Sequence, residues 1–206
     1  MAQVLKEELR ARILQAAGAE FATRGFKAAR LTDIARQAGT TASNLYKYAH
    51  DKEALFLQTV PPDLAARHID LLRARLAGFE QDQAWTLQTA DGSEAANALL
   101  MFWTGHRHAV AILMSNAYGT RYEAMREGMI EEMMARALQR FAQRNDSALA
   151  LVLRQIFSGT LDTISAILRQ YEQPEDIREA IRHFWRFQLA GLQALLTEEG
   201  WKTGQR

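Results

Sequence analysis

The residues after a short turn near the N-terminus have the size and polarity needed to contact nucleic-acid bases. The turn, Gly39-Thr40-Thr41, separates two predicted helices at 31–38 and 42–48, which is the spacing of a helix-turn-helix. Short side chains let a helix approach base edges closely, and an asparagine amide can form two hydrogen bonds with adenine. A helical hairpin with an ordinary polar outer face would show the same pattern, so this segment alone leaves both interpretations open. The outward residues of the second helix are Ala42, Ser43, Asn44 and Lys47.

Two further helices are predicted around this motif. Apolar residues recur at helical spacing over 3–24, and Gly25 follows as a residue suited to end that helix. Thr41 is predicted to cap helix 42–48 by accepting the amide of Ser43 or Asn44, and Asp51 is predicted to cap a fourth helix that begins at Lys52. We expect that helix to be interrupted at Pro61-Pro62 and to resume as far as about Phe79.

The charge is uneven along the chain in the way that a nucleic-acid-binding segment requires. Residues 1–52 contain nine Lys and Arg against five Asp and Glu, which gives a formal charge of +4. The 206-residue chain as a whole is +1, so residues 53–206 sum to −3. Neutralising phosphates supplies most non-specific affinity for DNA. A solvated surface also carries such charge, so the charge alone favours neither interpretation.

A longer stretch, residues 5–56, resembles the DNA-binding domain of the TetR/AcrR family of transcriptional regulators. The resemblance is carried by ILQAAGAEFATRGF at 13–26 and by LTDIARQAGTTASNLYKYAHDKEALF at 31–56. This chain departs from the family pattern at several positions. Arg30 stands where a capping threonine is usual, Thr40 replaces the valine after the turn glycine, Ala42-Ser43 replaces a frequent Lys-Gly pair, Lys47 replaces a His or Tyr, and Ala49 replaces an aromatic residue.

The resemblance implies a set of DNA contacts. Thr41, Ser43 and Asn44 are expected to face base edges or nearby phosphates, whereas Tyr48 is expected to pack inward. The remaining expected contacts are Tyr46 and Lys47 to backbone or bases, and Arg30 and Lys52 to phosphates. The partner that the resemblance implies is a double-stranded operator with an inverted repeat.

The rest of the chain is also predicted to be helical, with a loop in 80–92. Low Pro and Gly content and abundant Ala, Leu, Arg, Glu and Gln favour helix throughout. The fold class is therefore all-α, with a helix-turn-helix DNA-binding domain at 1–50 and a larger effector-binding and dimerisation domain at 51–206. The helices predicted in the larger domain are 94–104 with Ser93 as cap, 106–116, 121–143, 147–170 and 174–199.

The last two predicted helices carry apolar or small residues on two sides, which indicates that both sides are covered. In the TetR-like resemblance these helices form the four-helix bundle of a homodimer; packing within one chain is the alternative. Asp162 is predicted to pair with Arg182 or Arg186, and Ser165 to lie on the outer side. The expected dimer contacts are Ser158, Asp162, Phe187, Ala190, Gly191 and Ala194.

Large aromatic and methionine side chains concentrate between residues 99 and 129, and such side chains make adaptable walls for apolar or amphipathic ligands. A plain hydrophobic core would use the same residues. The candidates for contact with a small-molecule effector are Trp103, His106, Met114, Tyr122 and Met125.

Composition and motifs argue against several other functions. The chain has no cysteine, which excludes disulfides, thiolate metal sites and thiol nucleophiles. His106 and His108 lie two apart, on different helix faces, so no metal or cofactor is expected. No phosphate-binding loop or nucleophile elbow is present, and an enzyme is not expected. With no signal-peptide pattern and a longest apolar run of six residues, we expect a cytoplasmic protein without membrane contact; a helical small-molecule carrier is the alternative function.

Overall fold

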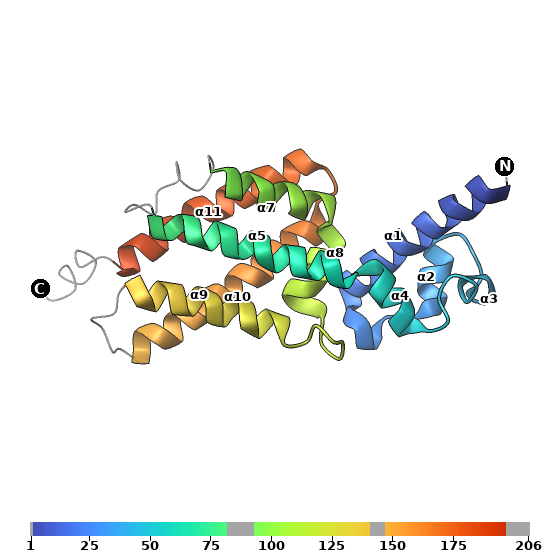
Figure 1. The fold of residues 1–206 in the computed structure, drawn as a ribbon, viewed down its shortest axis with the longest axis horizontal. Coiled ribbons are helices and arrows are strands. Elements are labelled where there is room, and N and C mark those ends of the chain that lie inside the picture. The colour runs from blue at the N-terminus through green and yellow to red at the C-terminus, as the bar shows by residue number, and fades with distance from the viewer. Residues whose placement is uncertain (1, 82–92, 141–146, 197–206) are drawn as a thin grey trace, which may run out of the picture.

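The computed structural model describes residues 2–81, 93–140 and 147–196, and within these ranges the chain is helical and contains no strand. The predicted loop residues 82–92 and the predicted helix ends at 141–143 and 197–199 lie outside the described residues. Figure 1 shows a small N-terminal group of helices at one end of an elongated helical body. The elements are α1 (Ala2–Ala28), α2 (Leu31–Gln37), α3 (Ala42–Leu45), α4 (Lys52–Thr59), α5 (Pro62–Gln81), α7 (Glu94–Gly105), α8 (Arg107–Ala111), the π-helix η1 (Ile112–Asn116), α9 (Met125–Arg140), α10 (Ser147–Gln170) and α11 (Pro174–Leu196).

An aromatic cluster and several alanines hold the N-terminal unit, α1 to α4, together. The ring of Phe56 on α4 packs edge-on against Phe21 and Phe26 of α1, with centroid separations of 5.3 and 5.2 Å. Ile34 of α2 and Leu45 of α3 are fully buried beside them. Because α4 shares this core, the packed unit extends past the predicted boundary at residue 50, and the division into 1–50 and 51–206 stays a prediction.

The predicted helix starts are confirmed by their caps. Thr41 Oγ1 accepts the amide of Asn44, Asp51 Oδ1 accepts that of Ala54, and Ser93 Oγ accepts that of Ala96. Arg30 precedes α2 without a side-chain cap hydrogen bond. The predicted break at Pro61-Pro62 is also confirmed, because α4 ends at Thr59 and α5 begins at Pro62.

Three predicted helix lengths are wrong. Helix 42–48 is only one turn long, because the chain turns away after Leu45. Helix 106–116 is a short α-helix followed by the π-helix η1, a wider turn that sequence periodicity does not reveal. Helix 121–143 begins at Met125, because residues 121–124 form turns.

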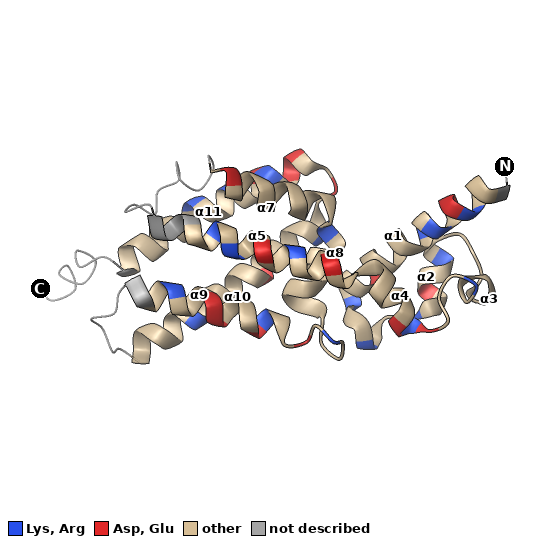
Figure 2. Ribbon diagram, in the orientation of Figure 1, with Lys and Arg blue, Asp and Glu red and all other residues tan. Residues whose placement is uncertain are grey.

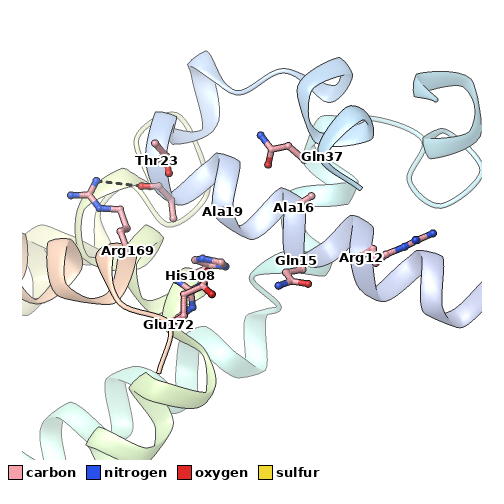
Figure 3. Close-up of a pocket in the computed structure, with 11 residues that line it drawn as sticks. Arg12, Gln15, Ala16, Ala19, Thr23, Gln37, His108, Arg169 and Glu172 are labelled. Atoms are coloured by element: carbon pink, nitrogen blue, oxygen red, sulfur yellow. Dashed lines mark hydrogen bonds and ion pairs between the residues drawn. The ribbon is translucent and has the colours of Figure 1, made fainter. Parts of the chain in front are cut away.

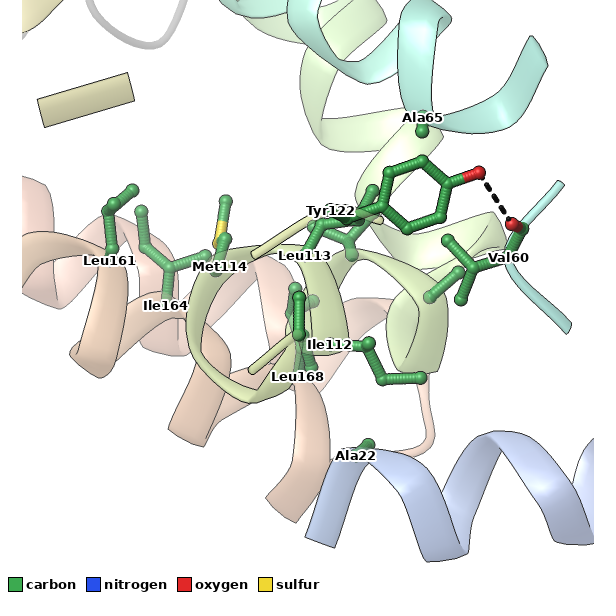
Figure 4. Packing of buried hydrophobic residues seen from close by; sticks show 14 of the residues in the cluster. Ala22, Val60, Ala65, Ile112, Leu113, Met114, Tyr122, Leu161, Ile164 and Leu168 are labelled. Atoms are coloured by element: carbon green, nitrogen blue, oxygen red, sulfur yellow. Dashed lines mark hydrogen bonds between the residues drawn. The ribbon is translucent and has the colours of Figure 1, made fainter. Parts of the chain in front are cut away.

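The core of the body surrounds η1. Figure 4 shows Ile112, Leu113 and Met114 of η1 among Leu161, Ile164 and Leu168 of α10, and all six side chains are buried. Beside them the Tyr122 hydroxyl donates a hydrogen bond of 3.1 Å to the Val60 carbonyl at the end of α4. The π-helix is therefore packed between the long helix α10 and the C-terminal part of α1.

Helix α10 is long and apolar enough by length and composition to cross a membrane, and 39% of its apolar stretch is buried within the fold. One side of it contacts α8, α9, η1 and α11, and its buried residues include Leu153, Phe157 and Leu161.

The N-terminal unit is fastened to the body at a break in α1. Gly25 has φ +73°, a left-handed conformation that glycine adopts without steric cost, and it interrupts α1 where the sequence predicts its end. Near this break the Ala22 carbonyl accepts hydrogen bonds from Asn116 of η1 and from Arg169 of α10. Gly18 brings α1 close to α8, since a Cβ there would lie 3.1 Å from the Cβ of His108.

Candidate nucleic-acid interface and ligand cavities

The outer side of α3 presents the polar residues that the sequence predicts for DNA contact. Thr41, Ser43 and Lys47 are exposed, and Tyr46 exposes 53% of its surface. Leu45 turns inward and Tyr48 packs against the core. Since α2 and α3 are joined by the short turn at Gly39, whose φ is +68°, this outer side is held in a fixed position on α2.

Asn44 is held by the turn that precedes it. Its Nδ2 donates to Thr40 Oγ1 at 2.9 Å, while its backbone amide donates to Thr41 Oγ1 at 3.2 Å. The side-chain amide retains a carbonyl oxygen and a second N–H, the two groups that pair with adenine. Thr40, which replaces the valine of the family pattern, thus orients the side chain expected to contact bases.

Lys52 has a structural role that sequence reasoning missed. Its Nζ donates to the carbonyls of Lys27 and Ala29, both at 3.2 Å, and lies 4.8 Å from the centroid of the Phe26 ring. It therefore ties the start of α4 to the end of α1. One N–H of the ammonium group is left for the predicted phosphate, and Arg30 lies exposed in the α1–α2 connection.

Basic side chains occur on α1, α2 and α4 and in the turn after α3, although acidic ones accompany them (Figure 2). On α2 the ion pair between Arg36 and Asp33, at 2.8 Å, neutralises one of these charges locally. Among the described residues Arg30 and Lys47 have no carboxylate partner. Their charge is consequently available to phosphates, in keeping with the predicted contacts.

The five predicted ligand contacts do not meet in one cavity. Trp103 lies beside a hollow of about 170 Å³ between α7 and α11, and exposed His106 beside one of about 470 Å³ near α1. Tyr122 and Met125 share a hollow of about 330 Å³ between α5 and α9. Met114 is part of the closed core around η1 and is fully buried. Of the five, only Tyr122 and Met125 are brought together.

The hollow between α5 and α9 has a largely apolar lining. Ile69, Leu72 and Met129 line it with Tyr122 and Met125, and the Arg73–Glu132 ion pair of 2.9 Å lies among its lining residues. Burial raises the pKa of the Tyr122 phenol, so the hydroxyl remains a donor to Val60 at neutral pH. A ligand here would touch the residue that joins α9 to the end of α4.

His68 is a buried polar residue that the sequence analysis missed. It is fully buried on α5, its Nδ1 accepts a hydrogen bond of 3.4 Å from Trp103 Nε1, and its Nε2 is buried without a partner among the described residues. Burial lowers its pKa to about 4, so the ring is neutral. The sequence did carry a signal for this burial. His68 falls at helical spacing with Leu64, Leu71 and Leu72, which form the apolar stripe of α5.

The predicted dimer residues all reach the surface of α10 and α11. Phe187 exposes 76% of its surface, and Ala190, Gly191 and Ala194 lie exposed along the same helix. On α10, Ser158 is partly exposed and Asp162 is exposed. Two apolar side chains of α10 are exposed as well, Leu151 at 61% and Val152 at 44% of their surface.

Two predictions about α10 are wrong. Asp162 pairs with Arg126 of α9, at 3.0 Å, rather than with Arg182 or Arg186, because α9 reaches α10 where α11 does not. Ser165 is buried rather than outward, and its hydroxyl donates to the Ala111 carbonyl at 3.1 Å beside Ser115. In both cases a polar side chain satisfies a backbone or charged group of another helix, which periodicity cannot reveal.

Known proteins share this organisation. The family model described as bacterial regulatory proteins, tetR family, matches residues 13–59. An uncharacterized HTH-type transcriptional regulator, YdgC of Bacillus subtilis, is 42% identical over 53 residues, which are 26% of this chain and 27% of that protein. The HTH-type transcriptional repressor SCO4008 of Streptomyces coelicolor is 30% identical over 129 residues, 59% of this chain and 65% of that protein. The matches thus span about a quarter and just under two thirds of these curated relatives.

The fold of the whole chain also has a solved counterpart. The crystal structure of a TetR family transcriptional regulator from Chloroflexus aurantiacus covers 90% of this chain and 92% of its own, with a TM-score of 0.51 and 21% sequence identity. That likeness shows a common fold for the N-terminal unit and the body. Residues 13–59 thus match the tetR family of bacterial regulatory proteins in sequence, and the whole chain has the fold of a TetR family transcriptional regulator.

Proposed function

We propose that this protein is a transcriptional repressor that binds an inverted-repeat operator as a homodimer and is released by a small-molecule effector. The observation that carries the proposal is the outer side of α3, where polar and cationic side chains stand exposed on a rigid helix-turn-helix. SCO4008, the longer of the two curated matches, is named as a repressor, which favours repression over activation.

In this proposal, α3 enters the major groove. Thr41, Ser43 and Asn44 face base edges, and the Thr40 hydroxyl holds the Asn44 amide ready for adenine. Tyr46 and Lys47 contact the backbone or bases, while Arg30 and Lys52 contact phosphates from the starts of α2 and α4. Phosphate contacts fix the position of the protein on the duplex, and base contacts select the sequence.

The second copy is proposed to dock on the exposed faces of α10 and α11. Phe187 and Leu151 are large apolar side chains that water surrounds in the single chain, and Ala190, Gly191 and Ala194 leave room for a helix to approach. Two α3 helices in one dimer would lie about 34–36 Å apart to enter successive major grooves, which requires an inverted repeat.

The effector is proposed to be an apolar or amphipathic molecule bound in the hollow between α5 and α9. Tyr122 connects this hollow to the N-terminal unit, because its hydroxyl bonds the Val60 carbonyl and its ring packs on Phe56 at 6.1 Å. A ligand that shifts Tyr122 would shift α4 with it. Coupling between such sites is usually about 1–3 kcal/mol and is reciprocal. The protein is proposed to act in the cytoplasm without cofactor or membrane.

Footprinting on the DNA upstream of the protein's own gene tests the proposal. A repressor of this kind protects an inverted repeat with half-sites one helical turn apart, and an excess of unrelated DNA does not remove the protection. The alternative, a helical small-molecule carrier, would protect no sequence at any protein concentration. Absence of protection on this DNA and on a pool of random sequences would reject DNA binding.

A further inference from the structure

A second cavity lies where the N-terminal unit meets the body. It has a volume of about 420 Å³, and α1 and α2 form one side of it while α8 and the end of α10 form the other. Figure 3 shows Arg12 and Arg169 at opposite ends of this junction cavity, with Gln15 and His108 between them. It is separate from the hollow between α5 and α9, with which it shares no lining residue.

The charge around the junction cavity is positive. Arg12, Arg107 and Arg169 line it against a single carboxylate, that of Glu172. Arg107 binds Glu172 at 3.1 Å and the Leu168 carbonyl at 3.2 Å, which satisfies the one acid. The guanidinium groups of Arg12 and Arg169 therefore remain without a carboxylate partner in the lining of the cavity.

The remaining guanidinium groups have unused donors. Arg169 donates to the Ala22 carbonyl at a long 3.4 Å, and a guanidinium has five N–H groups. Arg12 is exposed and, among the described residues, has no hydrogen-bond or ion-pair partner, so its side chain can turn over the cavity. Guanidinium groups bind carboxylate and phosphate oxygens in pairs, which gives both strength and geometry.

The other lining groups are neutral and polar. Burial, aided by the charge of Arg107, lowers the pKa of His108 to about 4, so its ring is uncharged and adds no competing cation. Gln15 and Thr23 supply an amide and a hydroxyl. Gln37 donates to Glu20 at 3.2 Å, and Glu20, which is 96% buried behind it, pairs with Arg24 at 3.3 Å. That acid is therefore neutralised away from the cavity.

We propose that the junction cavity binds a small organic anion with two acidic groups, such as a dicarboxylate or a phosphorylated carboxylic acid. One acidic group bonds Arg169 at the body end and the other bonds Arg12 on α1, with Gln15 and Thr23 donating between them. Such a ligand joins the N-terminal unit to the body by charge-assisted hydrogen bonds. It is a second regulatory ligand, distinct in chemistry and place from the apolar effector of the proposed function.

Isothermal titration of the full chain without DNA tests binding, with succinate and 3-phosphoglycerate as probes at constant ionic strength. Arg12→Gln and Arg169→Gln should each weaken probe binding about tenfold or more, because each removes a charge-assisted contact. Arg67→Gln, at another exposed arginine on α5 outside the cavity, is the matched control and should bind as the wild type does. Since Arg12 has no partner among the described residues, its replacement should leave the melting temperature without probe unchanged.

Absence of heat with both probes, or equal affinity in the wild type and Arg12→Gln, overturns the proposal. So does binding that Arg67→Gln weakens equally, because the anions would then respond to net charge alone. If Arg12→Gln lowers DNA affinity but leaves probe binding unchanged, this arginine contacts operator phosphates instead. These outcomes do not depend on the proposed function. The regulatory role of the ligand does rest on the proposed function. A probe that binds as described but leaves operator affinity unchanged would reject only that role.

Discussion

In the N-terminal unit, buried alanines and aromatic rings hold three short helices against α1, and the polar side chains point outward from α3. In the body, polar side chains reach inward and join helices far apart in sequence, as His68 joins Trp103 and Gln188 joins Thr160. The first arrangement fixes one outer surface. The second leaves hollows between helices, such as the one between α5 and α9.

The two regions share a hydrophobic core, and hydrogen bonds to backbone carbonyls also join them. Asn116 and Arg169 bind the Ala22 carbonyl of α1, and Arg126 binds the Met114 carbonyl of η1. Arg126 also donates to Ser158 Oγ at 2.8 Å and pairs with Asp162. Through this one arginine, the proposed dimer face on α10 is linked to the π-helix that contacts the N-terminal unit.

The largest effect is expected from substitutions in the proposed dimer face on α10 and α11. Gly191→Arg should give a monomer and lower operator affinity by more than about a hundredfold, because a bulky charge would be forced into a desolvated contact. A Cβ at Gly191 meets no atom within 4 Å in the single chain, so the substitution should not unfold it. Light scattering and DNA titration measure both effects. Ala194→Glu should behave in the same way.

Gly105→Arg is the control for this experiment, since Gly105 is equally open but lies on α7, away from the proposed face. It should remain dimeric. A fully dimeric Gly191→Arg protein, or a wild type that is monomeric at micromolar concentration, would show that α10 and α11 do not form the interface.

The next effect concerns the interior of the body and its response to pH. The pKa of His68 is about 4 in the folded protein against 6.5 when unfolded, so the unfolded chain binds more protons between these values. The stability of the fold is therefore fully present above pH 6.5 and falls as the pH drops toward 4. At pH 5 the loss from this one residue is about 2 kcal/mol.

His68→Gln keeps an acceptor for Trp103 but does not titrate, and it should remove about 2 kcal/mol of the difference in unfolding free energy between pH 7 and pH 5. Urea denaturation at the two pH values measures this difference. His183→Gln, at an exposed position on α11, should leave it unchanged. Equal pH dependence in His68→Gln and the wild type would contradict the buried neutral histidine.

A smaller effect separates two lysines of the N-terminal unit. Lys52→Ala should cost about 1 kcal/mol of stability, because it removes the hydrogen bonds to Lys27 and Ala29, whereas Lys47→Ala should cost nothing measurable. Both should reduce the slope of log affinity against log salt, by about 1 per phosphate contact and so about 2 for a dimer. If Lys52→Ala changes stability alone, Lys52 is a structural residue and its phosphate contact does not exist.

The sequence predicts the N-terminal unit better than the body for a physical reason. Caps at Thr41 and Asp51, the break at Gly25 and the turn at Gly39 depend on residues within a few positions of each other, which a sequence displays directly. The pairing of Asp162 with Arg126 and the burial of Ser165 depend on how long helices cross. Crossing geometry arises from packing over the whole body, so helix periodicity located these helices but not their contacts.

The candidate site divides in the same way. The outward position of Ser43 and Lys47 follows from a one-turn helix whose Leu45 must be buried. The support that Thr40 gives Asn44 was missed, because the family pattern has an apolar residue there. The ligand contacts were predicted from residue type alone, and that criterion does not distinguish Met114, which fills the core, from Met125, which lines a hollow.

The most direct test of the account is a fluorescence titration of wild type and Asn44→Ala on operator and random DNA at several salt concentrations. Loss of a paired contact with a base should lower the preference for operator by about 1–3 kcal/mol, roughly 5- to 150-fold, with the salt slope nearly unchanged. Dimerisation should also be unchanged, because Asn44 lies outside the body. Full preference for operator in Asn44→Ala would contradict the claim that α3 reads the DNA sequence through this residue.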